Sequence, residues 1–465
     1  MTNGKVYLIG AGPGDPALLT CKAKQLLSEC DVVCYDKLVS AAILASVPAH
    51  VKLHQVGYRG YQNCHINYGM HPDVMEYALA GKTVARLKAG DPCIFGRTTE
   101  ECKELIDNDI AYEIVPGITA ALGAAAYSGF PLTSGGVASS VTFISGHQHL
   151  KAMESWKSEQ DTGGTVVLYM GAKKLTEHAK NLIESGRNPN TPVALISSAT
   201  SADHQCITGT LENIGERVNR SPQSGPALVV IGDVVTQAEQ LDWRKHLPLA
   251  GQRFLICGQH EDKRALKNSG AEVIDIDYLP TDSFIDAEEL AFFQIQKELA
   301  FEDLATFKLW WQSLRENRWD IRQFSMPICS DDKHVVKALA DLAINAQPIS
   351  KQSMILTLEH NKVFESQQNY YQIGRRHSQP LEYALPNIDW LLVDDIAVAQ
   401  SIVEHHADAL TQAKTVPLNE NARLWAIDQG LLLDDSQHAV INESRFEEGD
   451  ELSTRQLRTN CADVA

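Results

Sequence analysis

The sequence predicts an α/β protein with largely parallel sheets, and three observations support that fold class. In residues 1–245, short apolar runs rich in β-branched residues alternate with helical patterns. Turns that contain glycine or proline directly follow several of these runs. The same turns carry polar residues, at the positions where parallel strands end and ligands bind. The fold class therefore indicates a ligand site along one edge of a sheet.

The elements of this first part follow from its pattern of apolar runs. The runs expected to be strands are 6–9, 32–35, 51–56, 83–87, 112–115, 141–145, 165–169, 193–197 and 227–231. Helical spacing lies between them, for example over 16–28 and 99–108. Pro131 and the pair Gly135-Gly136 predict a hinge between two subdomains.

The first of these turns, residues 10–15, reads Gly-Ala-Gly-Pro-Gly-Asp. Its glycines allow backbone conformations closed to other residues and let the main chain approach a ligand. The spacing differs from a dinucleotide fingerprint, because Asp15 stands where the third glycine is needed and Pro13 lacks an N–H for phosphate. Two interpretations remain: a tight turn without a ligand, or a binding turn for a ligand that is not a phosphate.

Length and composition limit the classes of protein. With 465 residues, of which 44% are apolar, the chain is long enough for two to three domains. No apolar run has membrane-spanning length, and the first residues lack the apolar region of a signal peptide. The ten cysteines have neither zinc-site nor disulfide-framework spacing. We therefore expect a cytoplasmic protein with reduced cysteines and no metal.

The net charge of −18 is unevenly distributed. Residues 1–245 carry 21 Lys and Arg against 24 Asp and Glu, whereas residues 246–465 carry 20 against 35. Neither part has the basic stripe that neutralises nucleic-acid phosphates. Nucleic acid is therefore not an expected partner, and the acidity belongs to the second part.

Five predicted strand ends carry unusual residues. They are Gly-Pro-Gly-Asp at 12–15, Asp36, Ala-Gly-Asp-Pro at 89–92, Pro-Gly-Ile-Thr-Ala at 116–120, and Met170-Gly171. One such end is ordinary, but five at one rim of α/β sheets indicate a pocket.

Eight segments of residues 1–245 resemble those of a known family. The segments 10–15, 35–40, 86–92, 95–101, 115–121, 126–133, 141–147 and 169–171 closely resemble uroporphyrinogen-III C-methyltransferases, of the tetrapyrrole methylase fold. The resemblance covers about residues 4–245, in order and at family-like spacing. It implies a methylase domain over 1–245 with two α/β subdomains, about 1–133 and 134–245, and S-adenosylmethionine in the cleft between them.

The resemblance also implies an activity: two methyl groups pass from S-adenosylmethionine to C2 and C7 of uroporphyrinogen III. The product would be precorrin-2, on the way to sirohaem or cobalamin, and the enzyme a homodimer. Asp36 falls on the family's catalytic aspartate and is the expected proton acceptor, although by itself it could be a helix cap. The positions implied for the cofactor are Pro13, Ala89, Gly90, Asp91, Ile94, Thr119, Ala120, Met170 and Ala199. Arg97 and Glu100 match substrate-facing positions, where an arginine suits a carboxylate; a solvated surface ion pair is the alternative for Arg97.

Two departures from the family pattern fall on the substrate side. Tyr58 stands where the family has a lysine proposed as proton donor, and Gly135 stands where an arginine is expected. A phenol can donate a proton but carries no positive charge, so Tyr58 is retained as a catalytic candidate. Two alternatives stay open: a weakly catalytic protein that binds a tetrapyrrole or a partner, and a methylase for another precorrin.

The second part begins after a linker at 237–248. Residues 249–257 and 269–276 resemble the opening of uroporphyrinogen-III synthase. Farther on, Glu302-Asp303 and Asp394-Asp395 stand where that family has hydroxyl residues, and carboxylates disfavour a polyanionic substrate. We expect a second α/β domain over 246–445 that is synthase-like but divergent, either structural or with residual synthase activity. Residues 446–465 are expected to be a disordered tail.

Overall fold

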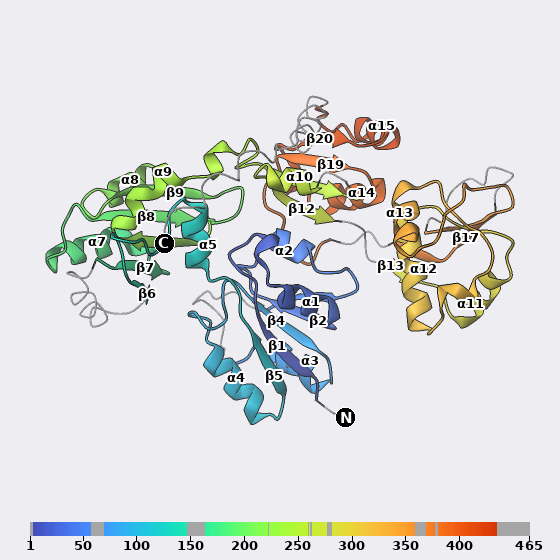
Figure 1. The fold of residues 1–465 in the computed structure, drawn as a ribbon, viewed down its shortest axis with the longest axis horizontal. Coiled ribbons are helices and arrows are strands. Elements are labelled where there is room, and N and C mark those ends of the chain that lie inside the picture. The colour runs from blue at the N-terminus through green and yellow to red at the C-terminus, as the bar shows by residue number, and fades with distance from the viewer. Residues whose placement is uncertain are drawn as a thin grey trace, which may run out of the picture.

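The structure, a computed structural model, describes residues 3–56, 69–146, 163–221, 223–258, 260, 263–276, 281–358, 369–376 and 380–434. The chain has two halves, a front half (residues 3–245) and a back half (residues 246–434), and each half contains two large sheets (Figure 1). The predicted tail at 446–465 lies outside the described residues. Within the described ranges, no helix has the length and apolar character needed to cross a membrane.

The first sheet of the front half has the strand order β3-β2-β4-β1-β5, and every neighbouring pair is parallel. Its strands are β1 (Lys5–Gly10), β2 (Val32–Tyr35), β3 (Lys52–Gln55), β4 (Val84–Lys88) and β5 (Ala111–Val115). Every residue of β2 and β4 is buried, as expected for central strands covered on both faces. Because all five strands run the same way, their carboxyl ends meet at one edge.

Helices cover both faces of this sheet. They are η1 (Pro16–Leu18), α1 (Cys21–Glu29), α2 (Ala41–Ala45), α3 (Pro72–Leu79) and α4 (Thr98–Asp107). Helices α1 and α2 share a core with one face, and α3 and α4 share a core with the other. Side-chain caps set several helix starts: Thr20 accepts from the third residue of α1, and Ser40 does the same for α2.

The second sheet has the order β6-β7-β10-β8-β9, and here the prediction of largely parallel sheets is wrong. Its strands are β6 (Val141–Ser145), β7 (Thr165–Tyr169), β8 (Pro192–Ser197), β9 (Gln205–Thr210) and β10 (Ala227–Ile231). Only β6 and β7 pair in parallel, whereas the other three pairs are antiparallel. The unpredicted strand β9 explains part of the difference, because the short connection after β8 returns the chain antiparallel to it.

Several helices pack around the second sheet. They are α5 (Ala120–Tyr127), η3 (Ala172–Lys174), α7 (Leu175–Glu184), α8 (Ile214–Arg220), η4 (Asp233–Gln237), α9 (Ala238–Leu241) and η5 (Arg244–His246). The buried alanines of α5 share a core with Phe130, Val167 and Val230. Helix α5 therefore packs with the second subdomain. The chain passes from the core of the first subdomain to that of the second before α5, and not near residue 133.

The back half has two lobes. The inner lobe contains the parallel sheet β12-β11-β19-β20 and the outer lobe the parallel sheet β15-β14-β16-β17; the antiparallel pair β13–β18 lies between them in the chain. The inner lobe comprises β11 (Arg253–Cys257), α10 (Lys263–Asn268), β12 (Glu272–Ile276), β19 (Trp390–Val393), α14 (Ile396–His405), η7 (Ala407–Leu410), β20 (Lys414–Pro417) and α15 (Glu420–Asp428). The outer lobe comprises α11 (Ala287–Gln294), β14 (Leu299–Phe301), α12 (Leu304–Glu316), η6 (Ile321–Gln323), β15 (Ile328–Cys329), α13 (Lys333–Asp341), β16 (Met354–Thr357) and β17 (Asn369–Gln372), and the connecting strands are β13 (Thr281–Ser283) and β18 (Gly374–Arg376). Figure 1 shows the outer lobe to the right of the other sheets.

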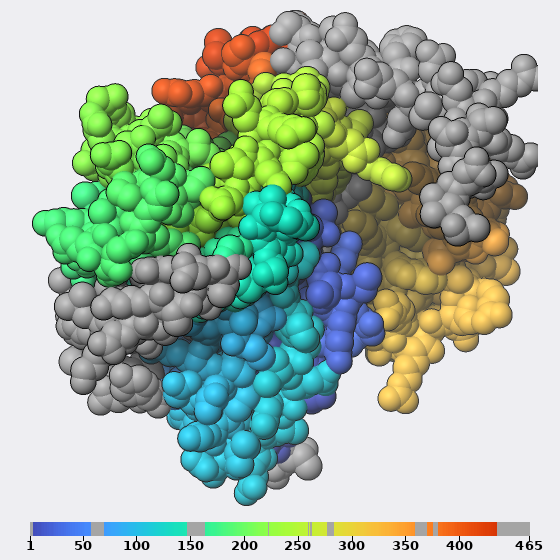
Figure 2. All heavy atoms as spheres, turned by 60° about the vertical axis from the view of Figure 1, so that its left-hand side comes forward, coloured from blue at the N-terminus to red at the C-terminus, as the bar shows by residue number. Residues whose placement is uncertain are grey.

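The inner lobe contacts the front half closely. Ala42 of α2 is buried in the inner-lobe core, and Tyr383 of the back half is buried in the core of the first sheet. The hydroxyl of Tyr35, the last residue of β2, donates to the carbonyl of Glu382. Figure 2 shows the segment that links the halves lying over the α5 region, where the indole N–H of Trp243 donates to the carbonyl of Ala126 at 2.9 Å.

Candidate functional site

The turns that follow β1, β4 and β5 touch one another through their backbones. Gly12 and Gly90 exchange two backbone hydrogen bonds, with N···O distances of 3.1 and 2.8 Å. A Cβ atom added to Gly117 would lie 2.5 Å from the carbonyl oxygen of Gly90 and 2.8 Å from the Cα atom of Gly10. Contacts this short exclude a side chain, because the neighbouring atoms are backbone. We call these four residues the glycine floor.

Asp91 ties the glycine floor together. Its carboxylate accepts the backbone N–H of Cys93 at 2.8 Å and that of Gly117 at 2.9 Å. Each bond satisfies a backbone donor in a turn, where a strand partner is lacking. The side chain of Asp91 is therefore engaged in joining the turns after β4 and β5, and Ile94 follows in the same turn, with its N–H donating to the Asp91 carbonyl at 3.2 Å.

The second subdomain meets the first turn at Asp15. The backbone N–H of Asp15 donates to the Thr200 hydroxyl at 3.1 Å, and its carboxylate accepts from the Tyr127 hydroxyl at 2.7 Å. Burial raises the pKa of Tyr127, and the hydrogen bond to Asp15 acts in the same direction. A Cβ atom on Gly123 of α5 would lie 2.5 Å from the Cγ atom of Pro13, so the turn and the helix are in direct contact.

An aromatic group faces the start of α5. The hydroxyls of Thr119 and Tyr169 lie 2.7 Å apart, and the Tyr169 hydroxyl also accepts the N–H of Ala121 at 3.1 Å. The ring of Phe95 lies 5.0 Å from that of Tyr169. Met170 comes directly after, with φ of +57° and 45% of its surface exposed. A left-handed conformation is uncommon outside glycine, and such residues cluster at ligand sites.

Asp36 lies at the carboxyl end of β2, beside a buried group of charges. Its carboxylate accepts from the guanidinium of Arg86 at 2.6 Å. Glu101 of α4 lies 3.6 Å from the same guanidinium and accepts from the ammonium of Lys88 at 2.5 Å. Arg86, Lys88 and Glu101 are each at most 5% exposed. The four formal charges alternate in sign and sum to zero, which is the arrangement in which buried charges are tolerated.

The structure brings most of the predicted cofactor positions together. Gly90 and Asp91 belong to the turns around the glycine floor, Pro13 contacts α5, and a Cβ atom on Gly90 would lie 3.4 Å from the N atom of Ala120. Ala199 approaches the first turn, because its carbonyl oxygen would lie 3.5 Å from a Cβ atom on Gly14. Ala89, half-buried, joins β4 to Gly90. What these residues bind stays a prediction.

The predicted substrate and catalytic positions are less completely described. Arg97, exposed and with φ of +57°, is the N-cap of α4, and Glu100 lies in the first turn of that helix. Tyr58 lies outside the described residues. Among the residues that the structure describes, a Cβ atom on Gly135 would meet nothing within 4 Å.

Sequence reasoning did not single out Arg86, Lys88 or Glu101 as site residues. A signal was available, since Arg86 and Lys88 alternate within an apolar strand and so point to one face. Charges on a covered face of a sheet require partners of opposite sign. The partner Glu101 lies next to the predicted Glu100 and differs from it in pointing inward.

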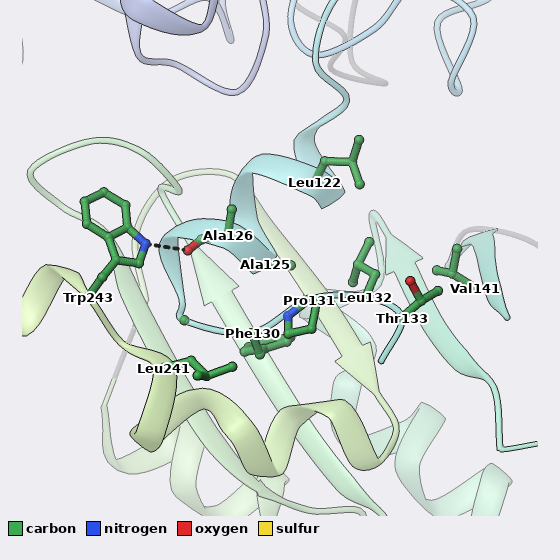
Figure 3. A pocket seen from close by; sticks show the side chains of 11 residues that line it. Leu122, Ala125, Ala126, Phe130, Pro131, Leu132, Thr133, Val141, Leu241 and Trp243 are labelled. Atoms are coloured by element: carbon green, nitrogen blue, oxygen red, sulfur yellow. Dashed lines mark hydrogen bonds between the residues drawn. The ribbon is translucent and has the colours of Figure 1, made fainter. Parts of the chain in front are cut away.

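An apolar groove of about 610 Å³ lies elsewhere on the second subdomain (Figure 3). Its lining residues come from α5, from the segment that follows it, from β6 and from the linker, and they include Leu122, Phe130, Val141, Leu241 and Trp243. None of the predicted site residues that the structure describes lines this groove. It is therefore separate from the turns described above.

The sequence of the front half is similar to those of known proteins. Residues 5–215 match the family model of Tetrapyrrole (Corrin/Porphyrin) Methylases. An S-adenosyl-L-methionine-dependent uroporphyrinogen III methyltransferase of Methanosarcina barkeri is 43% identical over 235 residues, which are 50% of this chain and 92% of that protein. A solved uroporphyrin-III C-methyl transferase from Thermus thermophilus, complexed with S-adenyl homocysteine, is 35% identical, covers 50% of this chain and 99% of its own, and has a TM-score of 0.43.

One further match bears on the back half. A uroporphyrinogen-III C-methyltransferase of Bacillus subtilis is 34% identical over 375 residues, 77% of each protein. Since 375 residues exceed the front half, this likeness extends into the back half. The chain spans only about half the length of the siroheme synthases that it also matches.

Proposed function

The chain belongs to the tetrapyrrole methylase family, and from this premise we propose that it methylates uroporphyrinogen III at C2 and C7. S-adenosylmethionine is the methyl donor, and the product is precorrin-2, for sirohaem or cobalamin synthesis. The observation that carries the proposal is the meeting of the glycine floor with Thr119 and Ala120 at the start of α5, while Asp36 lies at the carboxyl end of β2, the strand next to β4. The relative from Methanosarcina barkeri, whose length the chain nearly spans, supports the same activity.

The described residues fit S-adenosylmethionine. The glycine floor offers bare backbone without side chains, which lets a flat nucleoside approach closely. The first turn contains Pro13 and Asp15, and this combination tolerates a cationic ligand better than a phosphate. Thr119, Ala120 and Met170 on the second subdomain would complete the enclosure. When bound, S-adenosylmethionine supplies an electrophilic methyl group.

The protein's own residues then orient the two reactants and accept or donate protons. Holding the two reactants in line supplies several kcal/mol of the barrier reduction without any covalent intermediate. Asp36, at the edge where the turns meet, accepts the proton that the methylated macrocycle must lose. Arg97 binds one of the substrate's carboxylates, since a guanidinium forms paired hydrogen bonds with that group.

Two observations favour keeping an alternative for the substrate. Gly135, where an added Cβ atom would meet no described residue within 4 Å, stands where the family pattern has an arginine, and Tyr58 stands where that pattern has a lysine. Fewer cations on that side suit a precorrin with a different carboxylate arrangement, or weak turnover of a tetrapyrrole that is bound rather than converted. The cofactor part of the proposal is the same in each case.

The mass of the product distinguishes three hypotheses: methylation of uroporphyrinogen III, methylation of another precorrin, and binding with weak turnover. The purified chain is incubated anaerobically with S-adenosylmethionine and enzymatically made uroporphyrinogen III. We expect a gain of two methyl groups, at C2 and C7. No gain, with cofactor binding intact by calorimetry, would rule out the proposed reaction and leave the binding role; methyl groups at other carbons would show another precorrin methylase.

We also infer that the protein works in the cytoplasm as a homodimer, as the family resemblance implies. Light scattering coupled to gel filtration tests the second point. A mass near twice 51.2 kDa is expected, and a mass near 51.2 kDa would contradict it.

For the back half we propose a synthase-like domain whose present role is structural, with residual synthase activity as the alternative. Its inner lobe supports two front-half segments that reach the first turn. Helix α2 is held by the inner-lobe core, and the Ser40 hydroxyl that caps α2 also donates to the carbonyl of Gly14 at 2.6 Å. On the other side, Glu272 of β12 accepts the N–H of Ala202 at 2.7 Å, two residues beyond Thr200.

Arg253 is the sharpest test of this structural role. It is 3% exposed, pairs with Asp203 of the front half at 2.7 Å and with Glu272 at 2.9 Å, and donates to the carbonyl of Asn387 at 2.8 Å. Arg253→Met leaves the half-buried Glu272 without its cation, which we expect to cost about 2–4 kcal/mol. The melting temperature should fall by several degrees, and affinity for S-adenosylmethionine should fall with it.

The matched control is Arg322→Met in the outer lobe. Arg322 pairs with Asp320, but its side chain is 87% exposed, so its loss should leave both measurements unchanged. Equal effects of the two substitutions would contradict a supporting role for the interface. Uroporphyrinogen III formed from hydroxymethylbilane by the purified chain would instead establish residual synthase activity.

A further inference from the structure

We propose that Arg86, Glu101 and Lys88 form a positioning network that fixes the orientation of the Asp36 carboxylate. In this network Lys88 engages Glu101, so that Arg86 remains available to Asp36. The inference rests on the proposed function, in which Asp36 is the proton acceptor. None of the three network residues is assigned contact with substrate or cofactor.

The hydrogen bonds of Arg86 fix the orientation of the Asp36 carboxylate as well as its distance. One guanidinium nitrogen donates to the carboxylate of Asp36 at 2.6 Å, and another donates to the carbonyl of Leu87 at 3.3 Å. That same Leu87 carbonyl accepts the backbone N–H of Asp36 at 3.1 Å. The Leu87 carbonyl of β4 therefore anchors the main chain of Asp36 directly and its side chain through Arg86, which restricts the rotation of the carboxylate.

Glu101 could compete for the guanidinium. Its carboxylate lies 3.6 Å from Arg86, beyond hydrogen-bond reach, but 2.5 Å from the ammonium of Lys88. Lys88 is 1% exposed, on the same face of β4 as Arg86. Its depth gives it no access to a substrate, whereas its charge offsets that of Glu101. The function that remains for Lys88 is to keep Glu101 from drawing Arg86 away.

Three other titratable groups act electrostatically on this network. Burial raises the pKa of Cys34 to about 12, raises the pKa of Cys102 above its usual value, and lowers the pKa of His71 below its usual value. All three groups are therefore uncharged near neutral pH. Burial also lowers the pKa of Lys88 to about 8, so its ammonium is largely retained at pH 7.

The experiment compares four full-length variants with the unaltered chain: Arg86→Met, Arg86→Lys, Lys88→Met and the double variant Lys88→Met/Glu101→Gln. Single-turnover methyl transfer is measured from pH 5 to 9, and affinity for S-adenosylmethionine by calorimetry. Arg86→Met should lower the rate about 100-fold and move the acidic limb of the profile to higher pH, because a carboxylate without its cation is protonated more readily. Cofactor affinity should stay within about threefold.

The double variant makes the test specific. Lys88→Met alone should lower the rate about tenfold, because Glu101 then attracts Arg86. Adding Glu101→Gln should restore it to within about threefold and return the acidic limb, since the competitor has lost its charge. A role in packing alone predicts no such recovery. If Lys88→Met does not fold, the double variant and Arg86→Lys still give the comparison, and Arg86→Lys should show an intermediate shift of the limb.

The outcomes separate this inference from the proposed function. If the unaltered chain gives no methylated product, the proposed function fails before any variant is compared. If it turns over while Arg86→Met keeps both its rate and its acidic limb, the positioning network is wrong. A rate loss in Lys88→Met that Glu101→Gln deepens rather than restores would also overturn it.

Discussion

A Gly117→Ala chain is expected to lose most of its affinity for S-adenosylmethionine. The added Cβ atom would lie 2.5 Å from the Gly90 carbonyl oxygen and 2.8 Å from the Gly10 Cα atom, so all three turns must move. Overpacking of this kind costs about 1–3 kcal/mol of stability or more. A displacement of about 1 Å in a ligand site costs on the order of 100-fold in function. Calorimetry with S-adenosylmethionine and a thermal melt measure the two effects.

Gly135→Ala is the control for this substitution. Its Cβ atom would meet no atom of the described residues within 4 Å, so both affinity and melting temperature should remain unchanged. If Gly117→Ala binds S-adenosylmethionine as well as Gly135→Ala does, the glycine floor does not form the cofactor-binding site. The turns would then have only a structural role.

Asp36→Asn is expected to lower methyl transfer by about 10²–10⁴-fold, the usual contribution of a general base. The amide keeps nearly the same shape and can still accept from Arg86, but it cannot take up the proton. Affinity for S-adenosylmethionine should therefore change by less than about threefold. Anaerobic single-turnover assays, read by product mass, measure the first effect and calorimetry the second.

The matched control is Asp408→Asn, at an exposed aspartate of the inner lobe. It should leave rate and affinity unaltered. A rate for Asp36→Asn close to that of this control would show that another group accepts the proton. Tyr58, the other catalytic candidate, would then be the first residue to replace.

Much of the front-half fold was predictable because its strands are apolar over most of their length. All nine predicted strands of residues 1–245 are present, as runs such as Val32–Tyr35 are buried throughout and bounded by turns. Strand β9 was missed because Gln205–Thr210 mixes polar and small residues, and it lies half-buried at the sheet edge. Strand direction was wrong in the second sheet, since an apolar run looks the same in either orientation.

The candidate site was predictable to a different extent. Turn residues such as Gly12 and Gly90 stand out in the sequence, and their positive φ angles favour glycine. The network around Arg86 was not singled out, because its partner Glu101 comes from the next helix, α4, and only packing shows that this side chain points to β4 rather than to solvent. For the back half, the short connecting strands β13 and β18 carry too little pattern to indicate that one lobe is inserted within another.

The insertion of the outer lobe has a consequence for how the chain matures during translation. In the inner lobe, β11 pairs with β19. The strand that contains Phe254 therefore lacks this neighbour until Trp390 has been synthesised. Ribosomes add about 5–20 residues per second, so this wait lasts on the order of 10 s. During that interval the front half has all of its strands, whereas β11 and β12 present an open edge to solvent. We therefore expect the period before β19 emerges to be the stage at which nascent chains most need chaperones.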